Sequence, residues 1–97
     1  MIVGELDEIQ YDQEQDGELV RRQLARKIWE RRGWATVMVL FEEKRGDAWV
    51  GKCAIYRMKK KGEGWARHAV VTVSGDVAQE MAALIAAQAT AGDDDGE

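Results

Sequence analysis

The sequence predicts an α+β domain in which a helix, a three-stranded antiparallel sheet and a second helix follow one another along 97 residues. Two observations indicate the helices: apolar residues recur every three to four positions in residues 18–32 and again in residues 76–91, the period of an amphipathic helix. A third indicates the sheet: between these segments lie runs rich in β-branched and aromatic residues, separated by glycine-containing turns.

The first helix is predicted over residues 18–32, ELVRRQLARKIWERR. Asp16 stands where it can cap the start of the helix, and Gly33 stands where a glycine commonly ends one. The predicted apolar stripe, with residues four apart, consists of Val20, Leu24 and Ile28.

Three strands are predicted over residues 35–42, 48–58 and 65–74. The first strand, ATVMVLFE, is apolar on both faces, which indicates a central strand or one covered on both sides. A turn around Gly46 joins the first strand to the second, and the loop KKKGEG joins the second to the third as a long hairpin.

The second helix is predicted over residues 76–91, where alanine, the best helix former, dominates. Asp76 followed by Gln79 is a capping-box pattern. Apolar residues occupy more than one side of this helix, and the first strand is apolar on both faces. This is more apolar surface than a small domain covers, so we expect a homodimer with this helix at or near the interface.

Charge divides the chain into an acidic N-terminal segment (1–17), a single α+β domain (18–92) and an acidic tail (93–97). All 14 Lys and Arg residues lie in the middle part, so the net charge of −4 averages a basic body with acidic ends. An acidic overall charge therefore does not exclude nucleic acid as a partner.

The sequence predicts no catalytic residues, no metal ligands, no cofactor and no enzymatic activity. It contains one histidine, His68, and one cysteine, Cys53, too few for a metal site of ordinary composition. Cys53 is expected to be a small buried hydrophobic residue. A single thiol forms no intrachain disulfide, and the acidic N-terminus does not resemble a secretory signal, so we expect a cytoplasmic protein without a membrane anchor.

Basic residues interleaved with aromatic ones along the second and third strands are the candidate functional site. Lys and Arg bind phosphates, and flat rings stack on exposed bases. The candidate phosphate contacts are Arg57, Lys59, Lys60, Lys61 and Arg67, and the candidate stacking residues are Tyr56, Trp65 and Trp49. The alternative is that the tryptophans belong to the core and the lysines keep the hairpin soluble and block edge pairing.

The stretch GDAWVGKCAIYRMKKKGEGWARHAVVTVSGDVAQEMAALI resembles the positive-cofactor-four family of transcriptional coactivators, over about residues 35–91. The resemblance lies in the order of three strands and one helix, in the strand that ends in Ile55, Tyr56 and Arg57, and in the lysine-rich loop after it. It implies a small curved sheet, dimers, and binding of single-stranded DNA along the sheet. The chain departs from the family in its predicted helix at 18–32, in its unusually apolar first strand, and in lacking the family's proline before the third strand.

Three hypotheses of function follow. The favoured one is a non-catalytic module that binds single-stranded DNA or RNA as a homodimer. The second is a protein-interaction or structural homodimer with no nucleic-acid activity. The third is an accessory subunit or inhibitor whose acidic ends mimic nucleic acid.

Overall fold

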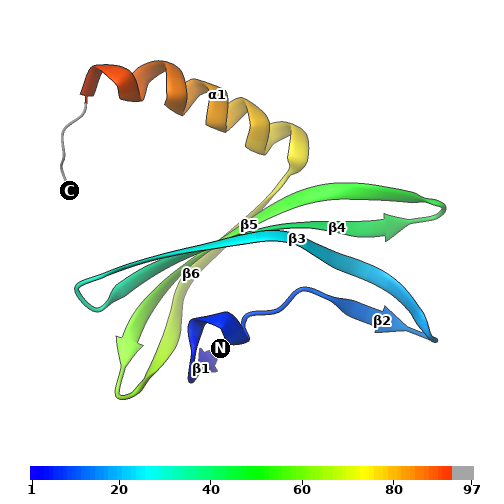
Figure 1. Ribbon diagram of the computed structural model, residues 1–97, viewed down its shortest axis with the longest axis horizontal. Coiled ribbons are helices and arrows are strands. Elements are labelled where there is room, and N and C mark those ends of the chain that lie inside the picture. Colours follow the sequence, from blue (N-terminus) through cyan, green and yellow to red (C-terminus); the bar gives the residue numbers. More distant parts are fainter. Residues whose placement is uncertain (93–97) are drawn as a thin grey trace.

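The computed structural model describes residues 1–92 and contains one curled six-stranded antiparallel sheet, a half-barrel, followed by a helix (Figure 1). The elements are β1 (Ile2–Val3), the 3-10 helix η1 (Leu6–Glu8), β2 (Gln13–Gln15), β3 (Glu18–Arg31), β4 (Trp34–Arg45), β5 (Ala48–Lys61), β6 (Gly64–Ser74) and α1 (Gly75–Gly92). The strand order is β1-β6-β5-β4-β3-β2, so four long strands form a meander and a short N-terminal strand borders it on each side.

The predicted fold class is therefore wrong: the sheet has six strands, and residues 18–32 form most of strand β3 rather than a helix. A four-residue spacing of apolar residues fits a helix, but it also keeps residues on one face of a strand, because four is a multiple of two. An irregularity in the pairing with β4 between Gln23 and Ala25 shifts the alternation, so that Ile28 faces the core while Leu24 lies on the opposite face.

Two tight turns explain why the segment folds as a strand. Asp16 and Gly17 both have positive φ, and so do Arg32 and Gly33. Positive φ at both central residues is the geometry of a type I′ turn, which joins adjacent antiparallel strands. The residues that resembled the two ends of a helix thus form hairpin turns at the two ends of β3.

The core lies on one face of the sheet, which we call the inner face. Its buried side chains come mainly from alternate positions of β4 and β5: Ala35, Val37, Val39, Phe41, Ala54, Tyr56 and Met58. The N-terminal segment crosses this face and contributes Leu6 and Ile9, both buried, to the same cluster. Residues 1–17 therefore complete the core. The other face is called the outer face.

The three predicted strands and the C-terminal helix are confirmed as elements. The strands are longer than predicted, and α1 extends one residue beyond the predicted range at each end. Its start is capped by Ser74, whose hydroxyl accepts a 3.3 Å hydrogen bond from the Val77 N–H, and not by the predicted Asp76. No helix within residues 1–92 has the length and apolar character needed to cross a membrane. The predicted acidic tail, 93–97, lies outside the described residues.

Candidate nucleic-acid interface

The sheet separates the predicted binding residues onto different faces. Register with β4 and β6 places Tyr56, Lys60, Trp65 and Arg67 on the inner face. The same register places Trp49, Arg57 and Lys59 on the outer face. Lys61 is the last residue of β5 and is exposed beside the hairpin turn. The eight residues therefore do not form one surface.

Two of the predicted stacking residues lie in the core. Tyr56 is 7% exposed and Trp65 is 4% exposed, so neither ring presents a face to a base. The ammonium group of Lys60 lies 4.9 Å from the centre of the Trp65 ring. Trp65 therefore lies in the core, as the alternative interpretation of the tryptophans expected.

A second group of basic and aromatic residues does share one surface, on the outer face near the β3–β4 turn. Two rows of paired residues cross strands β3, β4 and β5 here. One row is Arg31, Trp34 and Lys59, and the next is Trp29, Thr36 and Arg57. We call this surface the outer basic patch; it consists of Lys27, Trp29, Arg31, Trp34, Arg57, Lys59 and His68.

Trp34 is the centre of the outer basic patch. The Arg57 guanidinium carbon and the Lys59 ammonium nitrogen lie 4.8 Å and 4.5 Å from the centre of its ring. The His68 ring meets the indole edge-to-face at a centroid distance of 5.1 Å. Arg57 also donates a 2.9 Å hydrogen bond to the Thr36 hydroxyl. These contacts hold two cations on the surface at fixed positions.

Trp29 differs from Trp34 in its exposure. It is 48% exposed, between Lys27 and Arg31 on the same face of β3. An indole that is half exposed and flanked by cations has both features needed to bind a nucleotide: a ring to stack on a base and charges to meet its phosphates.

The outer basic patch carries no acidic side chain at any outer-face position of β3–β6 between the Lys27 row and the Arg31 row. The acids of the N-terminal segment lie with that segment across the inner face. There, Arg26 donates hydrogen bonds to the backbone carbonyls of Asp7 and Ile9, at 3.0 and 3.3 Å. The positive potential of the patch is therefore not neutralised by neighbours on its own face.

Sequence reasoning left Lys27, Trp29 and Arg31 out of the candidate site because it placed them on a helix. There Lys27 and Arg31 share a basic face, but Trp29, two positions from each, points to another side. On a strand, they alternate with Ile28 and Glu30 and point to the same side. This alternation in the sequence is the signal that could have identified the three residues as one surface. Trp34 was missed because it lies just before the predicted first strand.

Trp49 lies at the opposite end of the outer face. The Arg22 guanidinium carbon is 4.0 Å from the centre of its ring, and the same arginine donates a 2.7 Å hydrogen bond to Glu42. An acid therefore lies beside this aromatic–cation pair, which distinguishes it from the outer basic patch.

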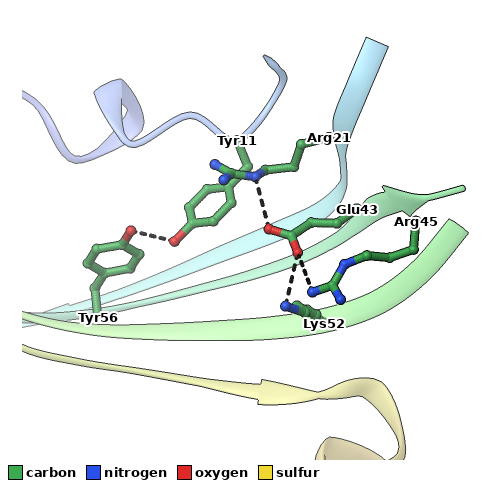
Figure 2. A network of polar contacts seen from close by, with 6 residues as sticks. All are labelled: Tyr11, Arg21, Glu43, Arg45, Lys52 and Tyr56. Atoms are coloured by element: carbon green, nitrogen blue, oxygen red, sulfur yellow. Dashed lines mark hydrogen bonds and ion pairs between the residues drawn. The ribbon is translucent and has the colours of Figure 1, made fainter. Parts of the chain in front are cut away.

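A network of charged residues occupies the inner face around Glu43 (Figure 2). Lys52 lies 2.9 Å from Glu43, and Arg21 and Arg45 each lie 3.4 Å from it. The pKa of Glu43 is lowered, chiefly because Lys52 donates a hydrogen bond to its carboxylate. The four side chains of this network together carry a net formal charge of +2.

Tyr11 anchors the N-terminal segment beside this network (Figure 2). Its ring packs against Phe41, with centroids 4.4 Å apart, and its hydroxyl is hydrogen-bonded to that of Tyr56. Burial raises the pKa of Tyr11, and the hydrogen bond with Tyr56 raises it further. The phenol of Tyr11 therefore stays neutral at physiological pH and serves as a structural partner of Tyr56.

An apolar groove of about 430 Å³ separates α1 from the outer face. It is lined on the sheet side by residues such as Met38, Leu40 and Ile55, and on the helix side by Met81 and Ile85. The helix touches the sheet mainly near its start, and Figure 1 shows it running away from the strands. Leu84 and Ile85 are 63% and 61% exposed, so α1 keeps a large apolar surface.

Cys53 lies buried at the floor of this groove, and burial raises the pKa of its thiol. A thiol of raised pKa is a weak nucleophile. Within residues 1–92, no three His, Cys, Asp or Glu side chains lie close enough together to hold a metal ion. Comparison of the chain with known protein families, curated proteins and solved structures finds no match.

Proposed function

We propose that the protein is a non-catalytic, cytoplasmic module that binds single-stranded nucleic acid on the outer basic patch. The observation that carries the proposal is the gathering of Trp29 and Trp34 with four cations, on a part of the outer face where β3–β6 place no acidic side chain. The resemblance of residues 35–91 to the positive-cofactor-four family, which binds single strands along a sheet, points to the same class of ligand.

The patch supports this function through two kinds of contact. Lys27, Arg31, Arg57 and Lys59 extend across three strands, so a backbone lying across the sheet meets successive cations. Trp29 offers a ring face for stacking, while Trp34 positions Arg57 and Lys59. Stacking on a base needs no particular hydrogen-bond pattern, so we expect weak sequence selectivity for DNA or RNA.

A second candidate function is protein docking at the groove between α1 and the outer face. The exposed apolar side chains of Leu84 and Ile85 favour it, because a contiguous apolar surface of this kind marks an interaction site. A chain that binds a protein partner here and binds no oligonucleotide would support this candidate over the first.

The experiment is fluorescence anisotropy of a labelled oligothymidylate titrated with the wild type and with two tryptophan variants. We expect Trp29→Leu to weaken binding by about tenfold, because one stacked base contributes roughly 1–3 kcal/mol. Trp49→Leu is the matched control: it removes an indole from the same face, outside the patch, and we expect it to bind like the wild type.

The proposal fails if the wild type binds no oligonucleotide at low salt. It also fails if Trp49→Leu weakens binding and Trp29→Leu does not. Circular dichroism of each variant confirms that the sheet is intact before the affinities are compared.

A further inference from the structure

Strand β6 has an edge that is unpaired over most of its length. β1 covers only its start: Ile2 and Val3 pair with Ala66 and Trp65, and the Arg67 N–H donates a 3.0 Å hydrogen bond to the Met1 carbonyl. Within residues 1–92, no strand pairs with His68–Ser74 on the side away from β5. Alternate residues along this stretch therefore direct N–H and C=O groups to an open side.

The side chains along this edge do nothing to block pairing. The stretch HAVVTVS contains no acid, lysine, arginine or proline, and Val71 is 51% exposed. Strand edges that stay unpaired are usually short or carry charges or proline. The opposite edge of the sheet follows that rule. There β2 has only three residues, QEQ, and residues 22–31 of β3, which β2 leaves unpaired, carry five charged side chains: Arg22, Arg26, Lys27, Glu30 and Arg31.

From this edge we infer that two copies of the chain pair antiparallel through β6, which joins the two half-barrels into one continuous sheet. Val71 is the midpoint of His68–Ser74, so a twofold axis at Val71 uses the whole unpaired stretch. An isologous contact of this kind closes on itself as a dimer. The inference is independent of nucleic-acid binding.

The stretch is complementary to itself in this register. Val71 lies opposite the partner's Val71, Val70 opposite the partner's Thr72, Ala69 opposite the partner's Val73, and His68 opposite the partner's Ser74. No pair brings like charges together, and the apolar residues meet apolar or β-branched ones, which are favourable cross-strand pairs. The irregularity at Arg57 and Met58, beside His68, marks where the regular edge ends.

Cysteine cross-linking tests the register directly. In a Cys53→Ala background, Val71→Cys is expected to form a disulfide-linked dimer, because directly opposed residues of an antiparallel pair have Cα atoms about 4.5–5.5 Å apart. Val73→Cys in the same background is the matched control. Its twofold-related thiols would be four residues out of register, about 13 Å along the strand, which is beyond disulfide reach.

Light scattering tests the interface without cross-linking. We expect a dimer for the wild type at micromolar concentration, and a monomer for Val71→Lys, which sets two ammonium groups opposite each other across the pair. Val50→Lys, on β5 away from the edge, should remain dimeric, and circular dichroism should show all variants folded. A monomeric wild type overturns the inference. So does a dimer that Leu84→Glu dissociates and Val71→Lys does not, which would place the interface on α1.

Discussion

Lys59 on β5 lies opposite Trp34 on β4, and its ammonium nitrogen lies 4.5 Å from the centre of the indole ring. Its neighbour in the chain, Lys60, points to the inner face and lies over Trp65. One peptide bond therefore separates a cation of the outer basic patch from a cation associated with the core. The lysine run KKK is continuous in sequence but divided between two surfaces.

The first prediction follows from this division. Replacing Arg57 and Lys59 together with alanine should flatten the dependence of log K on log salt concentration for oligothymidylate. About 0.7 of slope is lost per phosphate contact on a single strand, so the expected loss is about 1.4. The control replaces Lys60 and Arg67, which carry the same charge on the inner face, and should leave the slope unchanged. Equal slopes for both double variants would contradict the position of the patch.

The second prediction concerns Trp65, which the structure places in the core. Trp65→Leu should lower the free energy of unfolding by about 2 kcal/mol, because the smaller side chain leaves part of a buried site unfilled. Urea denaturation followed by circular dichroism measures it. Trp29→Leu, which changes a half-exposed ring, should alter stability by no more than about 0.5 kcal/mol. If Trp29→Leu proves the more destabilising change, the assignment of these two rings is wrong.

The third prediction uses the lowered pKa of Glu43. Because the pKa is lower in the folded state, the network around Glu43 stabilises the protein above the unfolded pKa of about 4.3, and this contribution is lost as pH falls through the folded pKa. Glu43→Gln should therefore cost about 1 kcal/mol at pH 7, a modest value because the carboxylate is partly exposed.

The pH dependence of this stability difference shows whether Glu43→Gln acts by removing the charge or by altering the packing of the side chain. The difference between wild type and Glu43→Gln in urea denaturation should be smaller at acid pH than at pH 7, because the wild-type carboxylate loses its charge as pH falls through its lowered pKa. Glu14→Gln is the control, because Glu14 is exposed and forms no ion pair within residues 1–92. Its effect on stability should be near zero at both pH values.

The sequence predicted correctly those elements whose residue pattern fits only a helix or only a strand. Strand β4 has apolar residues at consecutive positions with β-branched side chains, and α1 is too rich in alanine for a strand. Residues 18–32 satisfied both periods, because apolar residues four apart fit a helix and a strand equally. Pairing with β4 favours the strand over the helix: Arg21 forms an ion pair with Glu43, and Arg22 forms one with Glu42.

The site was predicted in part for the same reason. Arg57 and Lys59 were identified from a segment whose strand assignment was right, and they lie in the outer basic patch. Lys27, Trp29 and Arg31 lie in the segment whose assignment was wrong. Tyr56 and Trp65 were selected by residue type, but which face of a strand is buried depends on the N-terminal segment that covers it.

The last prediction tests the β3–β4 turn, where the helix and strand hypotheses differ most. Arg32 has φ 54°, in the left-handed region, where a non-glycine residue other than Asn or Asp pays about 1 kcal/mol. Arg32→Asn should therefore stabilise the protein by about 0.5–1 kcal/mol, since Asn-Gly is the preferred pair for a type I′ turn. Thermal unfolding should show a rise in Tm of about 3–6 °C for a chain of this size.

The neighbouring substitution Arg31→Asn is the matched control, because Arg31 is the last residue of β3 and asparagine is unfavourable in strands. It removes the same charge and should leave Tm unchanged or lower it. Were residues 18–32 a helix, Arg32→Asn would replace a better helix former in the last turn and also remove a cation that favours the helix C-terminus, so Tm would fall. A fall in Tm for Arg32→Asn would therefore contradict the hairpin, while a rise confined to position 32 requires the positive φ that only the turn provides.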